Sequence, residues 1–364
     1  MKLTIEQTKL ANLINSPTSV VEAKNTIPIL GHVKLSATHG QVEALATDLD
    51  IEAVALIDVD VTEVGECTVA AKPFEAIVKR LPKSALVTLE YNGTTLAINA
   101  GRSKFNLQTM PATDFPVMAT NEYTHTAQID AGVFLELLNK TKFAMSTEET
   151  RYYLNGVYLH NDEAGDLISV ATDGHRLAKM TYSGSIDVAG VIIPRKTVDR
   201  LTKLLDGVDG DITLQTSDSK MRVSGDGFSI TSKVVDGTFP DYTRVIPTSC
   251  KATMQVDAKE FSGAAGQVAT IADARSRVVR LSVSGDTCSL YSHSALYGEA
   301  VSEVSVEYDG ETLDIGFNSV YTADFMSQAE GGIVSVGLGG SMDPALVRFD
   351  ECAGFVGVLM PLRI

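Results

Sequence analysis

The stretch ATDLDIE (residues 46–52) decides the fold, because its opening Ala-Thr-Asp returns in ATDGHRLA (residues 171–178), 125 residues later. A second pair has almost the same spacing: the Phe-Pro of ATDFP (residues 112–116) recurs in DGTFP (residues 236–240), 124 residues later. Self-similarity at a fixed long period marks repeated structural units. A chain of 364 residues also exceeds what one hydrophobic core usually serves. The sequence therefore predicts two or three repeated domains.

Each copy begins with a short strand and a helix that carries a capping signal. Thr4 with Gln7 has the spacing of a capping box. Asp257 with Glu260 has the same spacing, and Asp130 is a candidate N-cap. Alternating β-branched runs predict strands at Val54–Val61, Leu167–Ala171 and Val278–Val283. Second helices are expected to start near Pro73, Pro194 and Asn318. Each copy thus consists of two half-units of a helix plus antiparallel strands, an α+β architecture.

Composition excludes several classes of protein. With 44% hydrophobic and 21% charged residues, the chain is typical of soluble folded domains. No apolar run reaches about 18 residues, so we expect no membrane segment and a cytoplasmic location. The four cysteines and six histidines are scattered, which gives no support for a disulfide framework or a metal site. A net charge of −16 excludes a protein that grips nucleic acid over its whole surface, so DNA contact must be confined to a local basic surface.

Two repeat-equivalent helical segments, 195–205 and 73–83, carry cations outside their apolar stripes. In the first segment these cations are Lys196, Arg200 and Lys203. A solvated helix face is the ordinary explanation for such residues. Their recurrence in an acidic chain instead favours helices that share one basic surface. The third copy departs from the pattern, since residues 319–328 hold one aspartate and no lysine or arginine.

Two other classes of function remain open at this point. An enzyme would need a constellation of reactive residues, and the chain has no GxxxxGK[ST], no GxSxG and no cluster of metal ligands. We therefore expect no catalytic residue and no cofactor. A repetitive β-rich interaction protein that binds no DNA would also have repeats and an acidic surface.

A series of motifs from one end of the chain to the other resembles the bacterial β sliding clamp, the processivity subunit (beta subunit) of the replicative DNA polymerase III. They are NTIPIL (25–30), ATDLDIE (46–52), GRSKFNLQTMPATDFP (101–116), TRYYLNGV (150–157), ATDGHRLA (171–178), IIPRKTV (192–198), DGTFPDYTRVIP (236–247) and VLMPLRI (358–364). They follow one another in the family's order, which makes the resemblance far more specific than any single motif.

The resemblance implies three clamp domains, at residues 1–124, 125–248 and 249–364. It implies a head-to-tail homodimer that forms a ring, with helices lining the hole and sheets forming the outside. Such a ring encircles double-stranded DNA without reading its sequence, because contacts to phosphates position a protein but specify nothing. It tethers the DNA polymerase, clamp-loader subunits and repair proteins through their linear peptide motifs, and it has no enzymatic activity.

The resemblance also implies a DNA-facing surface, whose members would be Lys24, Lys72, Arg80, Tyr152, Tyr153, Arg195, Lys196, Arg200 and Lys203. For the two tyrosines, core packing beside Leu154 is an equally good interpretation. At the ring joint, the strand expected at residues 101–110 would meet the third domain of the second subunit. The residues implied at this joint are Arg102, Lys104, Phe105, Leu107, Thr270, Ile271, Glu299 and Glu303.

A peptide-binding cleft is the third site that the resemblance implies. Asp173-Gly174 is a turn signal between two strand-like runs, which by itself indicates only a hairpin. The C-terminus is apolar to its end, and Pro361 predicts a strand that leaves its sheet. The cleft residues implied are Leu154, Thr172, Gly174, His175, Arg176, Leu177, Pro240, Arg244, Val245, Asn318, Tyr321, Met342, Pro344, Val358, Met360, Pro361, Leu362 and Arg363. Methionine and proline suit an adaptable apolar pocket.

Overall fold

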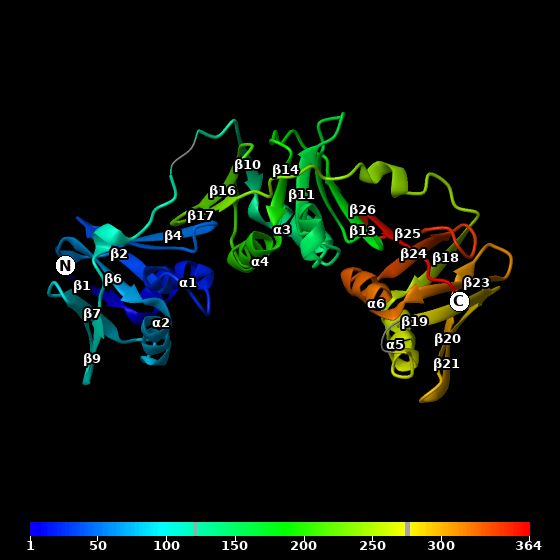
Figure 1. Ribbon diagram of the computed structural model, residues 1–364, viewed down its shortest axis with the longest axis horizontal. Helices are drawn as coiled ribbons and strands as arrows, with labels where there is room; N and C mark the ends of the chain where they lie inside the picture. The colour runs from blue at the N-terminus through cyan, green and yellow to red at the C-terminus, as the bar shows by residue number, and fades with distance from the viewer. Residues whose placement is uncertain (120–121, 274–276) are drawn as a thin grey trace. The chain divides into compact units, whose positions relative to one another are not determined.

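The computed structural model describes residues 1–119, 122–273 and 277–364, and the chain forms two compact units (Figure 1). The first unit comprises Met1–Leu135 and Asp187–Val234, and the second comprises Glu136–Ile186 and Val235–Ile364. Helix α3 (Ala131–Lys142) contains the chain boundary between them. The predicted α+β architecture is confirmed, since helices and antiparallel sheets make up both units.

The first unit contains a five-stranded and an eight-stranded antiparallel sheet. The five-stranded sheet has the order β5 (Val61–Glu63), β1 (Lys2–Glu6), β7 (Leu86–Tyr91), β8 (Thr95–Ala100), β9 (Ser103–Gln108). The eight-stranded sheet has the order β10 (His125–Asp130), β15 (Asp211–Thr216), β16 (Lys220–Gly225), β17 (Phe228–Lys233), β4 (Ile51–Asp58), β3 (Gln41–Thr47), β2 (His32–Thr38), β6 (Gly65–Ala70). The helices of this unit are α1 (Gln7–Val20), α2 (Ala71–Arg80) and α4 (Arg195–Leu204), which follows β14 (Val191–Pro194). Helix α1 packs on α2 and on strands β3 and β4.

The second unit repeats this plan. One of its sheets runs β11 (Gly156–Asn161), β12 (Leu167–Thr172), β13 (Arg176–Tyr182), β26 (Cys352–Leu359), β25 (Ala345–Phe349), β24 (Ile333–Leu338), β18 (Ala252–Asp257), β22 (Glu307–Tyr308). The other has the order β21 (Gly298–Ser305), β20 (Thr287–Ser294), β19 (Val278–Ser284), β23 (Leu313–Asn318). Helices α5 (Ala258–Ala269) and α6 (Ser319–Gln328) pack against each other. The chain also has four 3₁₀ helices in its described part: η1 (Pro28–Gly31), η2 (Ala112–Asp114), η3 (Glu149–Leu154) and η4 (Tyr242–Val245).

The same three-stranded meander occurs in every half-unit. The first halves of the three repeats contain β2-β3-β4, β11-β12-β13 and β19-β20-β21, and the second halves contain β7-β8-β9, β15-β16-β17 and β24-β25-β26. Within the chain, the last strand of a first half pairs with the last strand of the next repeat's second half. Strand β4 pairs with β17, with Ala53 opposite Ile230, and β13 pairs with β26, with Ala178 opposite Gly357. Both pairings are antiparallel, so each one continues a sheet from one repeat into the next.

Helix starts follow the predicted capping signals with one exception. Asp257 caps α5 by accepting hydrogen bonds from the amides of Lys259 and Glu260, and Asn318 caps α6 in the same way. The Asp130 carboxylate accepts from the Val133 amide. The capping box predicted at Thr4 is wrong, because Thr4 lies inside β1, where its hydroxyl bonds across the sheet to Thr88.

A fully buried phenylalanine anchors each of four helices in the core. Phe74 in α2, Phe134 in α3, Phe261 in α5 and Phe325 in α6 are all fully buried. Burying such a side chain contributes about 2–3 kcal/mol relative to leaving it in water, so these four positions hold each helix against its sheet.

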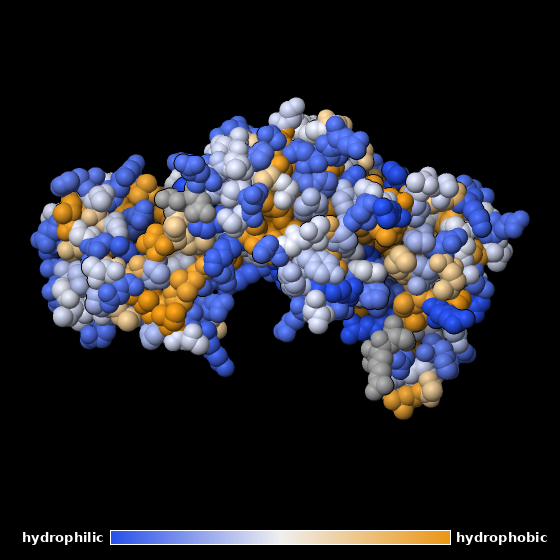
Figure 2. All heavy atoms as spheres, turned by 45° about the horizontal axis from the view of Figure 1, so that its top comes forward, coloured by the Kyte–Doolittle hydropathy of each residue, from blue (hydrophilic) through white to orange (hydrophobic). Residues whose placement is uncertain are grey.

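In the view of Figure 2, hydrophilic residues cover much of the visible surface, and hydrophobic residues lie between them in smaller patches. Within the described ranges, no helix is long and apolar enough to span a membrane.

Candidate functional site

An apolar pocket lies in the second unit where β12, β13 and β26 meet the segment that ends in η4. Its volume is about 190 Å³. The residues that line it are Leu154, Thr172, Gly174, Arg176, Leu177, Pro240, Asp241, Tyr242, Val245, Val358 and Met360. Leu177 and Val358 form its floor because they lie opposite each other on the paired strands β13 and β26. A pocket of this size and polarity suits one or two apolar side chains of a bound peptide.

The hairpin between β12 and β13 sets one rim of this pocket. The Asp173 carboxylate accepts hydrogen bonds from the amides of His175 and Arg176, at 2.9 and 3.0 Å, and the Thr172 hydroxyl donates to the Arg176 carbonyl at 2.6 Å. Gly174 has a φ of +87°, and a Cβ atom there would lie 2.6 Å from Nη1 of Arg151. Only glycine therefore fits this turn, and the hairpin predicted from Asp173-Gly174 is confirmed.

Arg176 ties this hairpin to α6. Its guanidinium is buried and donates to Asp173 at 3.0 Å, to Asp324 at 2.5 Å and to the Phe143 carbonyl at 2.6 Å. It also lies 4.3 Å from the ring centre of Tyr321. Burial raises the pKa of the Tyr321 phenol, which keeps it protonated at neutral pH. Arg176 thus fixes Tyr321 beside the hairpin through charge and ring contact together.

The C-terminal tail leaves its sheet after β26, as predicted from Pro361. The Met360 amide donates to the His175 carbonyl at 2.9 Å, and the Leu362 amide donates to the Gly316 carbonyl at 2.7 Å. Two backbone bonds therefore hold the tail beside the hairpin and the start of α6. The tail is therefore held in place beside the hairpin and is not a frayed end.

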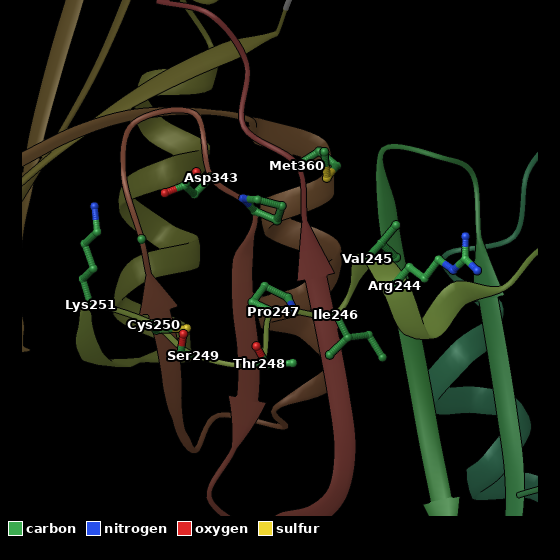
Figure 3. Close-up of a pocket in the computed structure, with 12 residues that line it drawn as sticks. Arg244, Val245, Ile246, Pro247, Thr248, Ser249, Cys250, Lys251, Asp343 and Met360 are labelled. Atoms are coloured by element: carbon green, nitrogen blue, oxygen red, sulfur yellow. The ribbon is translucent and has the colours of Figure 1, made fainter.

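A second, larger hollow adjoins the first and shares Val245 and Met360 with it. Its volume is about 570 Å³. Figure 3 shows the segment Ile246–Lys251 along it, with Asp343 and Met360 on another side. Met360 borders both hollows and is 37% exposed, so a peptide could pass from one to the other over an adaptable side chain.

The two hollows together bring many of the predicted cleft residues to one place. These are Leu154, Thr172, Gly174, Arg176, Leu177, Pro240, Arg244, Val245, Pro344, Val358 and Met360. Other predicted residues line neither hollow: His175, Asn318, Tyr321, Met342, Pro361, Leu362 and Arg363. Of these, the His175 ring stacks on Tyr321 with 6.3 Å between the ring centres, and Asn318 is the N-cap of α6.

Two lining residues of the apolar pocket, Asp241 and Tyr242, were missed by the sequence analysis. They stand between Pro240 and Arg244, both of which were predicted. The signal available was their place inside the motif DGTFPDYTRVIP, and an Asx-type cap at Asp241, which accepts from the Thr243 amide, starts η4. Assigning every residue from Pro240 to Val245 to the cleft would have included both of them.

The predicted DNA-facing cations of the first unit lie on α2, α4 and the turn after α1. Lys24, Lys72, Arg80 and Lys203 are exposed, and Arg195, Lys196 and Arg200 are half-buried. The Lys72 ammonium donates to the Ala23 carbonyl at 3.2 Å. The members of the predicted surface therefore differ in exposure, and the surface itself remains a prediction.

Lys196 is already engaged within the protein. Its ammonium pairs with Glu22 at 2.6 Å and with the nearly buried carboxylate of Asp48. Burial disfavours the charged ammonium, but the hydrogen bonds to Asp48 and Glu22 outweigh it and raise the pKa of Lys196. To contact a phosphate, this ammonium would have to give up carboxylate partners, so its predicted role remains a prediction.

The two predicted tyrosines lie on η3 in the second unit. Tyr152 is 54% exposed and Tyr153 is half-buried, with 5.8 Å between their ring centres. The alternative of core packing beside Leu154 does not fit Tyr152. Arg151 of η3 pairs with Glu148, the residue just before this helix, and the hydrogen bond lowers the pKa of the Glu148 carboxyl.

Two exposed sheet edges carry the residues predicted at the ring joint. Among the described residues, β9 pairs only with β8, and β21 pairs only with β20. Phe105 and Leu107 are half-buried on β9 while their neighbours are exposed. Arg102 and Lys104 are exposed beside them, and Glu299 and Glu303 are exposed on β21. Thr270 and Ile271 follow α5, which packs on β21.

Reactive chemistry has little support in the described residues. They contain no group of three or more side chains that could hold a metal ion. Their four cysteines are free, and burial raises the pKa of Cys67 and of Cys288 to about 12. Such thiols are inert at neutral pH.

The chain matches three domain families in order. Residues 1–119 match "DNA polymerase III beta subunit, N-terminal domain", residues 128–241 match the central domain, and residues 243–363 match the C-terminal domain.

Similar proteins share its whole length. A beta sliding clamp of Caulobacter vibrioides is 42% identical over 376 residues, and one of Pseudomonas aeruginosa is 34% identical over 368 residues, each covering 100% of both chains. The crystal structure of a sliding clamp from Bartonella birtlesii bound to griselimycin is 37% identical, with a TM-score of 0.97 over 100% of both chains. That of the Pseudomonas aeruginosa clamp bound to griselimycin is 34% identical, with a TM-score of 0.95 over the same share.

Proposed function

The chain belongs to the DNA polymerase III beta subunit family, the bacterial β sliding clamps, and we propose that two copies close head to tail into a ring around duplex DNA. It is a sliding clamp, a non-catalytic processivity factor that tethers the replicative polymerase and repair proteins to DNA. The proposed clamp domains are residues 1–124, 125–248 and 249–364, and the proposed location is the cytoplasm, where bacterial replication takes place.

The observation that carries the ring is a pair of strands, β9 and β21, each of which has one edge without a partner in the part of the chain that the structure describes. Each junction within the chain joins the last strand of a first half to the last strand of a neighbouring second half, as β4 joins β17 and β13 joins β26. By the same rule, β21 requires the strand equivalent to β17 and β26. That strand is β9, and in a closed ring it comes from the second copy. An unpaired edge invites such pairing, and a joint between β9 and β21 would leave neither of these two edges exposed.

Charge and hydrophobicity along these edges support the same joint. Strand β9 has the cations Arg102 and Lys104 nearby, and β21 presents Glu299 and Glu303. Complementary charges favour the correct register and disfavour pairing of like edges. Phe105 and Leu107, with Ile271, would supply the apolar centre.

Sedimentation tests the joint. Phe105→Arg places a charge in the proposed apolar centre and should dissociate the dimer at concentrations where the wild type stays intact. Leu86→Arg is the matched control, because Leu86 is 62% exposed on β7, away from both edges, and this variant should sediment as wild type does. Wild-type sedimentation of Phe105→Arg would place the joint elsewhere.

The proposed DNA-facing surface is the cationic set on α2, α4 and the turn after α1, with Tyr152 and Tyr153. A net charge of −16 repels DNA from the protein as a whole. Cations gathered on helices that line the hole would attract the backbone weakly and without regard to sequence. Because enclosure retains the DNA, weak contacts suffice and permit sliding.

The proposed peptide-binding cleft consists of the two hollows with the C-terminal tail. Its apolar floor, its methionine at the junction and its fixed Arg176–Tyr321 wall suit short linear peptides of polymerase, clamp-loader and repair proteins. The relatives bound to griselimycin supply a probe for this cleft, and we expect griselimycin to bind here. Binding that is unaffected by Leu177→Arg would exclude the cleft.

A further inference from the structure

One wall of the cleft has little backbone support. Residues 236–245 contain only the short helix η4, and in the described chain no backbone hydrogen bond joins them to a neighbouring strand. They nevertheless supply Pro240, Asp241, Tyr242 and Val245 to the apolar pocket. Side chains must therefore hold this wall in place.

Four aromatic rings do so. Phe239 and Tyr242 are each 8% exposed, and they pack against Tyr158 and His160, which lie two residues apart on the same face of β11. The Tyr158 ring stacks on His160, with 4.5 Å between centres, and on Phe239, with 5.0 Å between centres. The stack gives this wall hydrophobic burial, but ring stacking alone leaves it free to slide.

The polar link that fixes the register is a hydrogen bond between Nε2 of His160 and the hydroxyl of Tyr242, at 3.0 Å. The other ring nitrogen, Nδ1, lies 2.8 Å from the Asn161 carbonyl oxygen, which can only accept. Nδ1 therefore carries the proton, and in the neutral ring Nε2 accepts from the Tyr242 hydroxyl. A protonated ring would have two donors and could no longer accept this proton.

We propose that His160 is a positioning residue of the peptide cleft, which holds the wall formed by residues 239–245 through Tyr242 and makes peptide affinity depend on pH. This inference rests on the proposed function, because it assigns a role within the same cleft. His160 lines neither hollow, so it acts only through the wall.

The surroundings of His160 set the direction of the pH effect. Burial is the main cause that lowers its pKa below the ordinary value of 6.5, and the positive charge of Lys179 on β13 adds to it. The Asn161 carbonyl and the carboxylate of Asp162 oppose the shift. From η4, burial raises the pKa of Tyr242 to about 12, so this phenol remains a donor. Because the folded pKa of His160 is lowered, the positioned wall is fully present above 6.5 and is lost as the pH falls through the lowered value.

Calorimetric titration with griselimycin, from about pH 8 to about pH 5, tests the proposal. Wild-type affinity should fall by about fivefold across His160 protonation, the effect of one lost hydrogen bond. His160→Gln keeps an acceptor that does not titrate. This variant should bind griselimycin as tightly as wild type at high pH and should not show the fivefold fall in affinity at low pH. His160→Phe keeps the ring stack without an acceptor, so it should bind about fivefold more weakly at every pH.

His175 is the other histidine beside the cleft, where its ring stacks on Tyr321, so each profile is measured again in a His175→Gln background. In that background, the chain that retains His160 should still lose more griselimycin affinity at low pH than the chain that also carries His160→Gln. An independent readout is the ring resonance of His160, which should titrate below 6.5 in wild type. In Tyr242→Phe its pKa should rise, because the hydroxyl no longer donates to the neutral ring, but burial should keep it below 6.5.

Different outcomes would contradict the role of His160 and the proposed cleft. Superimposed profiles for wild type and His160→Gln, with normal binding at pH 8, overturn the role of His160 and leave the cleft intact. Absence of griselimycin binding by wild type at every pH overturns the proposed cleft and this inference with it.

Discussion

Replacing Arg176 with methionine tests whether the cleft wall is built on a buried charge network. The substitution keeps the length and apolar stem of the side chain and removes the guanidinium that binds Asp173, Asp324 and the Phe143 carbonyl. Removing one partner of a buried ion pair costs about 3–5 kcal/mol, because the remaining charge stays desolvated.

The exposure of the two carboxylates narrows the expected loss of stability. The Asp173 side chain is only 14% exposed, so losing its guanidinium partner costs nearly the full penalty of an unpaired buried charge. Asp324 is 38% exposed, so water partly replaces the guanidinium there. Two backbone amides still donate to Asp173 after the change. We therefore expect Arg176→Met to lower the free energy of unfolding by about 3 kcal/mol.

Urea unfolding followed by circular dichroism measures this loss. The matched control is Arg280→Met, which removes a similar ion pair with Asp314 at 2.6 Å, whose side chains are 45% and 41% exposed. An exposed pair contributes less than about 1 kcal/mol, so the control should unfold nearly as wild type does. If Arg176→Met loses no more stability than Arg280→Met, the cleft wall does not depend on this network.

Three further outcomes follow from the geometry. Deletion of Pro361–Ile364 removes the backbone bond from Leu362 to Gly316 that holds the tail beside the cleft, so griselimycin binding should weaken while stability falls by only about 1 kcal/mol; unchanged affinity would exclude the tail from the site. Charge reversal of the exposed Arg80 and Lys203 should reduce the loading of the protein onto circular DNA while changing stability by no more than about 0.5 kcal/mol; unaltered loading would move the DNA contact elsewhere. Burial raises the pKa of the Glu52 carboxyl above 4.5 in the folded protein. Its ionisation therefore lowers the free energy of unfolding as the pH rises from 4.5 through the raised pKa. Glu52→Gln should therefore be at least as stable as wild type at neutral pH in urea unfolding, and a clear loss of stability would contradict this reasoning.

Much of the fold could be predicted from local signals. The repeat indicated the half-units, Asp257 and Asn318 marked helix starts, and Asp173-Gly174 marked the hairpin of the cleft. Each of these depends on a few neighbouring residues whose chemistry permits one backbone conformation. Pro361 likewise predicted the end of the last strand, because it has no amide to donate.

The remainder depended on contacts between distant segments. Thr4 looked like an N-cap, but pairing with β7 turns its hydroxyl toward Thr88. Lys196 looked free, but Glu22 and Asp48 reach it from far along the chain. No spacing rule in a single sequence reports such partners, so helix periodicity identified a cationic face without showing which cations are already paired.

The most direct test of the ring is topological. The protein is loaded onto nicked circular DNA by a clamp loader with ATP, and the same DNA is then cut once with a restriction enzyme. We expect the protein to stay on the circle and to leave after the cut, because enclosure retains it rather than affinity. Equal retention on circular and linear DNA would contradict this account, because contacts alone would then be holding the protein.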